Sequence, residues 1–159
     1  MTEVIYQKLN EEYVERAKRL IYEYVKWLNV DLAFQGFEVE MNTFPALYAE
    51  PFGCFLIALA DDGGDEVVGC VALKPLSGEI CEMKRLFVAD KFKGKGIGKE
   101  LISRLIVEAR KKGYKKMRLD TAQTLMIKAK SLYDYFGFVE IKAYVYNPYP
   151  DIVFMELEL

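Results

Sequence analysis

The sequence predicts an α+β domain built on one mixed β-sheet. Two apolar runs around an Asp-Asp-Gly-Gly turn are typical of a β-hairpin. The middle of the chain then alternates strand-like and helix-like patterns, and two more strand-like runs follow. Because the 159 residues contain no linker or internal repeat, we expect a single domain over residues 1–159.

The first 50 residues predict a strand, a helix and a less regular segment. Residues 3–8 favour a short strand, and Asn10 is placed to cap the helix that follows. Apolar residues mark that helix at helical spacing: Tyr13, Ala17, Leu20, Ile21, Tyr24, Val25 and Leu28. Residues 29–50 lack a clean period, so we expect a second short helix and loops there.

The predicted hairpin and the strand after it occupy the centre of the chain. Residues 54–60 and 66–73 form the two strands of the hairpin. Pro75 and Gly78 are expected to interrupt the chain before a further strand over residues 80–88.

The second half of the chain alternates helices and strands. A glycine-rich turn at residues 93–98 leads into a helix that is expected to stop near Gly113. Residues 115–121 predict a strand. The next helix is marked by Leu125, Ala129, Leu132, Tyr133 and Phe136, and ends at Gly137. Two final strands are expected near residues 138–146 and 152–158.

The composition excludes several kinds of site. The chain has no histidine, which rules out Ser–His and Cys–His nucleophiles and makes a metal site improbable. Cys54, Cys70 and Cys81 are far apart in apolar surroundings, which favours free buried thiols in a reducing compartment. No apolar run is long enough to span a bilayer, and the first residues lack a signal-peptide pattern. We therefore expect a cytoplasmic protein that makes no membrane contact.

Charge is distributed unevenly along the chain. Residues 84–118 hold 13 of the 22 Lys and Arg residues but only 3 of the 24 Asp and Glu residues. A basic centre suits an anionic ligand, and the acidic remainder is consistent with a cationic one. The alternative is a solvated charged helix face.

The most informative segment is the run from Lys93 to Gly98, Lys-Gly-Lys-Gly-Ile-Gly, between a predicted strand and a predicted helix. Glycines let backbone N–H groups converge on an anion, and the helix start adds positive potential. The pattern lacks the Ser or Thr of a Walker loop after Lys99, and the third glycine of a dinucleotide-binding loop is absent. We interpret it as a pyrophosphate site, the alternative being a turn that only joins the two elements.

The chain resembles the GNAT (GCN5-related) N-acetyltransferases. The family signature Gln/Arg-x-x-Gly-x-Gly/Ala is present here as Lys93-x-x-Gly96-x-Gly98, with lysine in the first position. Residues 80–88 resemble the family's fourth strand, and residues 129–138 resemble its A-x-x-L-Y-x-x-x-G-F segment. The resemblance implies the GNAT fold, a central sheet of about seven mostly antiparallel strands flanked by helices.

The resemblance also implies acetyl-CoA as the co-substrate. Backbone groups of Leu86, Phe87 and Val88 would bind the pantetheine arm, and the Val88 N–H would polarise the thioester carbonyl. The pyrophosphate would lie over Lys93, Gly94, Lys95, Gly96, Ile97, Gly98 and Lys99. Many relatives carry Asn three residues before Ala129, where this chain has Met126, so that contact is absent or replaced.

Two residues are candidates for proton transfer. Tyr133 matches the position where the family often has its general acid, which would protonate the leaving thiolate. Its alternative role is packing in the core. Glu82 aligns with a fourth-strand glutamate that serves some relatives as the base. Its alternative role is a salt bridge, with Lys84 or Arg85 as the partner.

The acceptor amine is expected opposite the cofactor. An aromatic wall could hold it by cation–π contacts, from Trp27, Phe34 and Phe37 on one side and Tyr144, Tyr146 and Tyr149 on the other. The alternative for each is an ordinary core or rim role. A small amine, an amino acid and a protein amine all fit as acceptors, and a homodimer is one possible assembly.

The proposed reaction is direct attack of the amine on acetyl-CoA, because no histidine is present to activate a cysteine. Two other functions are weighed. One is a non-catalytic acyl-CoA-binding sensor or partner domain. The other is nucleic-acid binding, which the low pI of about 5.4 and the few aromatic residues in the basic segment disfavour.

Overall fold

A computed structural model describes residues 3–29, 31–33, 36–61 and 65–159. Its strands are β1 (Val4–Lys8), β2 (Cys54–Asp61), β3 (Asp65–Ser77), β4 (Ile80–Val88), β5 (Lys116–Ala122), β6 (Val139–Ile141) and β7 (Ile152–Glu158). Its α-helices are α1 (Val14–Leu28), α2 (Phe37–Asn42), α3 (Ile97–Lys111) and α4 (Ile127–Phe136). Short 3₁₀ turns precede α1 at Glu11–Tyr13, follow α2 at Ala46–Tyr48, and follow β4 at Asp90–Phe92.

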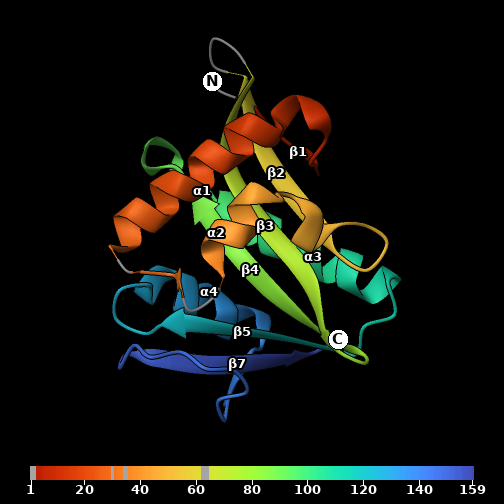
Figure 1. The fold of residues 1–159 in the computed structure, drawn as a ribbon, viewed down its shortest axis with the longest axis vertical. Helices are drawn as coiled ribbons and strands as arrows, with labels where there is room; N and C mark the ends of the chain where they lie inside the picture. The colour runs from red at the N-terminus through yellow and green to blue at the C-terminus, as the bar shows by residue number, and fades with distance from the viewer. Residues whose placement is uncertain (1–2, 30, 34–35, 62–64) are drawn as a thin grey trace.

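The strands form one seven-stranded sheet in the order β1-β2-β3-β4-β5-β7-β6 (Figure 1). All neighbouring strands run antiparallel except β4 and β5, which are parallel. The connection between these two is the helix α3, as a parallel pair requires a crossover. The predicted α+β class and the mixed, mostly antiparallel sheet are confirmed.

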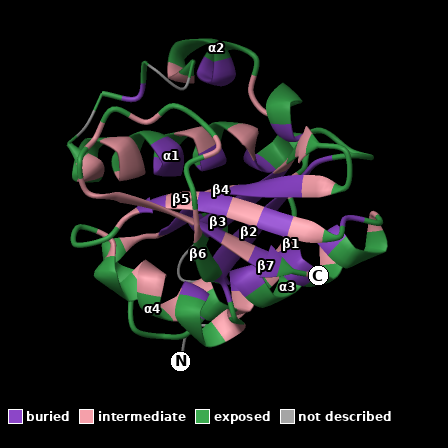
Figure 2. Cartoon of the chain, turned by 90° about the horizontal axis from the view of Figure 1, so that it is seen from below, coloured by how far each residue is buried: buried purple, intermediate pink, exposed green. Residues whose placement is uncertain are grey.

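Helices cover both faces of the sheet, with α1 and α2 on one side and α3 and α4 on the other (Figure 2). Alternate residues of each strand therefore enter different cores. On β4, Cys81, Met83 and Leu86 join the core beneath α3 and α4, whereas Phe87 packs in the core beneath α1. For this reason β2 is buried and apolar over nearly its whole length.

The start of α1 follows the predicted cap, with one difference. The side chain of Asn10 accepts a hydrogen bond from the Glu12 N–H at 3.1 Å, but the first turn is 3₁₀ and α1 proper begins at Val14. The predicted apolar stripe is inside, since Ala17, Leu20 and Ile21 are all buried against the sheet.

Two element predictions near strand ends are wrong. Pro75 does not break the chain but lies within β3, where its missing N–H is tolerated because β2 pairs with β3 only as far as Leu73. The strand expected over 138–146 is only Val139–Ile141. The chain after Ile141 leaves the sheet, and Tyr144 then bonds to a residue of β4, as described below.

A third difference concerns α4. The helix begins at Ile127, so Leu125 lies in the turn before it, while its C-terminal limit at Gly137 is as predicted. In the described part of the chain, no helix is both long and apolar enough to cross a membrane.

Candidate active site

The parallel strands β4 and β5 separate along their length. They pair only from Ile80 to Glu82 and from Lys116 to Arg118, and beyond these residues no pairing joins them. Arg85 has a left-handed backbone with φ of 61°, and the register between β3 and β4 shifts at this place, which is a β-bulge. The two strands therefore diverge next to a bulge in β4.

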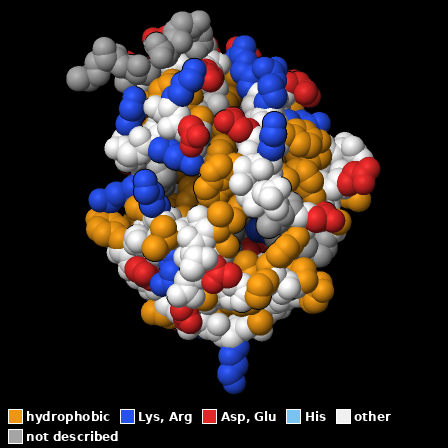
Figure 3. All heavy atoms as spheres, turned by 90° about the vertical axis from the view of Figure 1, so that its left-hand side faces the viewer, with side chains coloured by type: hydrophobic (Ala, Val, Ile, Leu, Met, Phe, Trp, Pro, Cys, Tyr) orange, Lys and Arg blue, Asp and Glu red, His pale blue; other side chains and the backbone are white. Residues whose placement is uncertain are grey.

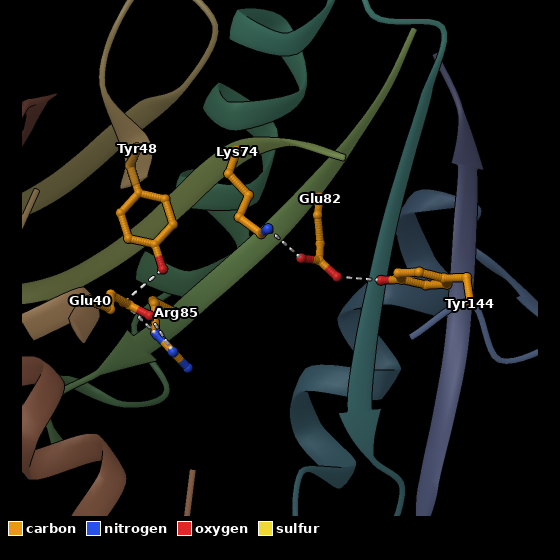
Figure 4. Close-up of polar contacts among 6 residues, drawn as sticks. All are labelled: Glu40, Tyr48, Lys74, Glu82, Arg85 and Tyr144. Carbon is orange, nitrogen blue, oxygen red and sulfur yellow. Dashed lines mark hydrogen bonds and ion pairs between the residues drawn. The ribbon is translucent and has the colours of Figure 1, made fainter. Parts of the chain in front are cut away.

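A buried ion pair fixes the side chain at the bulge. The guanidinium of Arg85 donates to both carboxylate oxygens of Glu40 on α2, from Nε at 3.0 Å and from Nη2 at 2.6 Å (Figure 4). The hydroxyl of Tyr48 donates to the same carboxylate at 2.7 Å. Burial alone would raise the pKa of Glu40, but the hydrogen bonds and charge of Arg85 outweigh it and lower that pKa. A non-glycine residue with positive φ is thus held by a two-pronged contact.

Where the strands part, the surface is hollowed by a cleft of about 240 Å³. Figure 3 shows the side of the molecule toward which β4 and β5 end, with hydrophobic side chains gathered around this hollow. The lining comes from α1, β4, β5, α4 and the loop before β7, and its polar members include Tyr24, Lys84, Arg85, Asp120, Thr121, Tyr133, Asn147 and Tyr149.

The glycine-rich loop beside β4 has the backbone expected of an anion cradle. Gly94 and Gly96 have φ of 78° and 81°, a conformation that side chains disfavour, and the space beside both is open. Gly96 is the N-cap of α3, so the first N–H groups of the helix, from Ile97 onward, have no partner within the helix. These N–H groups are hydrogen-bond donors beside open space, so they could bind a pyrophosphate.

The lysines of this loop contact aromatic rings. Lys93 pairs with Asp90 at 3.0 Å, and its Nζ lies 4.7 Å from the centre of the Trp27 ring and 5.6 Å from that of Phe87. Lys95 lies over Phe92 at 5.1 Å, and Lys99 over Tyr135 at 4.3 Å. Trp27 therefore adjoins the cofactor loop, and it is not among the residues that line the cleft.

Tyr133 lines the cleft and is 5% exposed. Its ring packs edge-on against Phe138 with centroids 5.7 Å apart, so part of the side chain serves the core. Burial raises the pKa of its hydroxyl, and the neighbouring Tyr24 and Asp120 raise it further. The phenol is consequently protonated at neutral pH, as a general acid must be.

Glu82 lies outside the cleft lining. It is 3% exposed, accepts a hydrogen bond from the Tyr144 hydroxyl at 2.7 Å, and pairs with Lys74 of β3 at 3.7 Å (Figure 4). Its ion-pair partner is thus Lys74 and not Lys84 or Arg85. Burial and the charge of Glu82 raise the pKa of Tyr144, so its hydroxyl keeps its proton and donates the hydrogen bond to Glu82.

The other aromatic candidates for the acceptor wall are dispersed. Tyr146 is 75% exposed and does not line the cleft. Phe34 lies outside the described residues. Phe37 packs edge-on against Tyr22, with the Arg85 guanidinium 5.5 Å from its ring centre, and it is not among the residues that line the cleft. Tyr149 does line the cleft, where its hydroxyl donates to the Asp31 carbonyl and accepts from the Asp31 N–H, both at 2.8 Å.

Several residues of the cleft were not predicted, among them the polar residues Tyr24, Lys84 and Asn147. Tyr24 was assigned only to the apolar stripe of its helix, although a tyrosine hydroxyl usually requires a polar surrounding. Lys84 could have been recognised as a site candidate, because it is a charged residue in a largely apolar strand. Met126 lines the cleft as well, so an apolar side chain occupies the position where many relatives carry Asn.

Similar sequences and structures agree with this geometry. The acetyltransferase (GNAT) family model matches residues 6–138. An uncharacterized N-acetyltransferase of Schizosaccharomyces pombe is 38% identical over 143 residues, covering 89% of this chain and 86% of the relative. One of Dictyostelium discoideum is 33% identical over 210 residues, covering 93% and 95%.

Solved structures share the fold at low sequence identity. A GNAT-family acetyltransferase of Staphylococcus aureus superposes with a TM-score of 0.80 at 22% identity, covering 98% of this chain and 99% of that one. The PaiA N-acetyltransferase of Thermoplasma acidophilum, solved with coenzyme A, has a TM-score of 0.73 at 18% identity, and 99% of each chain is covered. With the divergent strands, the glycine-rich loop and the family match, the chain belongs to the GNAT acetyltransferase family and is an acyltransferase.

Proposed function

We propose that the protein transfers the acetyl group of acetyl-CoA to a primary amine by direct attack in the cleft between β4 and β5. The observation that carries this proposal is the divergence of β4 from β5 next to an open glycine loop at the start of α3. An extended pantetheine arm fits beside a strand edge that has lost its neighbour, and its pyrophosphate fits the loop.

The backbone of β4 supports a contact to the thioester carbonyl. The Ala89 N–H donates to the Val68 carbonyl of β3 at 2.8 Å. Because N–H groups of an antiparallel strand alternate in direction, the N–H of Val88 is directed away from β3, toward the side that β5 has left open. We assign Val88 the role of polarising the carbonyl, with Leu86 and Phe87 offering the remaining strand edge.

The cysteines support direct transfer rather than an acyl-enzyme. Cys54, Cys70 and Cys81 are free and buried, and burial raises the pKa of each thiol to about 12. The chain has no histidine to activate them. The same free thiols are consistent with a cytoplasmic location, which we also propose.

The proton balance assigns a role to each candidate. The acceptor ammonium first loses one proton. Its nitrogen then forms a bond to the carbonyl carbon, the carbon–sulfur bond breaks, and the nitrogen loses a second proton. Tyr133 would give its proton to the leaving thiolate and would regain one of the two protons that the nitrogen loses, so one proton is released overall. Glu82 does not line the cleft, so its role as the base would operate through water or through Tyr144.

A thermal-shift experiment with acetyl-CoA, coenzyme A, ATP and NAD tests the cofactor site. A ligand at one hundred times its Kd adds about 2.7 kcal/mol, or roughly 5–10 °C in Tm for a chain of this size. We expect stabilisation by the two CoA compounds only, followed by thiol release when amines are added. Stabilisation without thiol release from a broad amine panel would favour a non-catalytic acyl-CoA-binding domain. No stabilisation would overturn the cofactor assignment.

A further inference from the structure

Two oppositely charged side chains flank the point where β4 and β5 part. Glu82 and Arg118 form the last paired position of the two strands, and Lys84 and Asp120 each lie two residues farther along. Met83 and Leu119, between them, enter the core beneath α3 and α4. Lys84 and Asp120 therefore project from the opposite face of the sheet, beneath α1, and both line the cleft.

The acidic residues around Lys84 already have other partners. Glu40 is bound by Arg85 and Tyr48, and Glu82 by Tyr144 and Lys74. Among the described residues, Lys84 makes neither an ion pair nor a side-chain hydrogen bond.

Burial lowers the pKa of Lys84, and the charge of Arg85 lowers it further, against the opposing effects of Glu82, Asp120 and Glu40.

Asp120 is the complementary case. Its carboxylate accepts a hydrogen bond from the neutral amide of Asn147 at 3.2 Å, which leaves its charge in place. No lysine or arginine of the described residues lies within ion-pair distance of it, and Lys84 is no exception. The parting strands thus present a cation, Lys84, and an anion, Asp120, that do not form an ion pair with each other.

We infer that the acceptor is a free amino acid, with its carboxylate bound by Lys84 and its amino group held at Asp120. This inference rests on the proposed function and names the substrate class of that site. A polyamine would bring a second cation to Lys84, and a simple monoamine, as an ammonium ion, would pair with Asp120 but leave Lys84 without a partner. A zwitterion supplies both counter-charges at once, and a cleft of about 240 Å³ suits a small molecule.

The charges in the cleft differ from what the overall charge distribution of the sequence indicates. The acid excess outside residues 84–118 is consistent with a cationic acceptor, but that excess is spread over the surface. Among the described residues that line the cleft, Lys84, Asp120 and Asp151 are charged and make no ion pair, and the Asp151 carboxylate is bound by Thr124. Lys84 and Asp120, which lie at the point where the two strands part, have opposite signs. The recognition of a zwitterion is a property of this pair of strands and not of the overall charge.

The test compares amines that differ only in the carboxylate. Thiol release from acetyl-CoA is measured with the common L-amino acids, with their C-terminal amides, and with the matching decarboxylated amines. We expect the wild-type protein to favour at least one free amino acid over its amide. In Lys84→Met that preference should fall about 10- to 100-fold in kcat/KM, the effect of losing one charge-assisted hydrogen bond. The KM for acetyl-CoA should stay unchanged.

Two further variants complete the design. Asp120→Asn keeps an acceptor for Asn147 but removes the charge, and should lower kcat/KM for free amino acids and for their amides alike. Lys111→Met is the matched control, because Lys111 is exposed at the end of α3 and does not line the cleft. It should leave all rates unchanged.

The outcomes separate the inference from the proposed function. If amides and simple amines are acetylated as fast as the amino acids, the inference is overturned while the acetyltransferase proposal stands. If coenzyme A binds but no amine is acetylated, the proposed function fails, and the Lys84 side chain is then titrated by NMR, its signal assigned by its loss in Lys84→Met. With coenzyme A present, saturating L-amino acids should raise the pKa of Lys84, whereas their amides should not. An unchanged pKa would overturn the inference.

Discussion

The buried pair between Glu40 and Arg85 gives the sharpest prediction of the structure. Both side chains are almost fully enclosed, and Arg85 stands at the bulge that directs the stretch of β4 that we propose binds the cofactor. Glu40→Gln keeps the shape of the side chain but removes the carboxylate charge that the guanidinium binds. Removing one member of such a pair costs about 3–5 kcal/mol. For a chain of this size that is a fall in Tm of roughly 6–20 °C.

The assay is urea unfolding combined with coenzyme A binding by calorimetry. Tyr48→Phe is the control, since it removes one hydrogen bond to the same carboxylate and should cost only about 1 kcal/mol. We also expect Glu40→Gln to weaken coenzyme A binding, because the bulge loses the contact that holds Arg85. A double variant with Met at both positions should be more stable than Glu40→Gln alone. Equal destabilisation by Glu40→Gln and Tyr48→Phe would refute the reasoning.

The same pair predicts a dependence of stability on pH. The pKa of Glu40 is lower in the folded protein than its ordinary value of 4.5. Its contribution to the free energy of unfolding is therefore present in full above pH 4.5 and is lost as the pH falls through the folded pKa. The difference in unfolding free energy between wild type and Glu40→Gln should shrink over that acidic range, and a constant difference would count against the assignment.

Three further predictions concern catalysis and cofactor binding. Tyr133→Phe should lower kcat by about 10²–10⁴-fold without changing the Kd of acetyl-CoA measured by calorimetry, as expected for a general acid. Gly96→Ala should weaken coenzyme A binding, whereas Gly113→Ala, which imposes the same backbone strain at a distance from the loop, should lower only the Tm. Glu82→Gln and Tyr144→Phe should change the pH–rate profile in the same way if both belong to one proton path, and an unaltered profile in either would exclude that path.

Much of the fold could be predicted because the local signals agree with one another. Each long strand and helix has an apolar period, and glycine or asparagine stands at most helix ends. Pro75 was misjudged because its neighbours determine its tolerance: β2 ends its pairing at Leu73, so the missing N–H costs nothing there. Such a fact about strand pairing is not encoded in the local pattern.

Part of the candidate site could be predicted from local sequence, and part of it could not. The glycine-rich loop was predictable, because positive φ values and a helix start leave a local mark in the sequence. Trp27 and Tyr144 were expected in the acceptor wall, but the structure places one against Lys93 and the other on Glu82. The local sequence around an aromatic residue does not show whether its ring lines a cleft or packs elsewhere at the surface. Only the tertiary packing determines this.

The sequence by itself determined the α+β class, the order of its main elements and the glycine-rich loop at the start of α3, since each depends on neighbouring residues along one segment. The tertiary structure alone decided which charges are satisfied. It brings Glu40 to Arg85 and Tyr144 to Glu82 over long stretches of chain, and it leaves Lys84 and Asp120 facing the cleft without ionic partners. Charge pairing depends on distance in space, which a sequence specifies only through the complete fold.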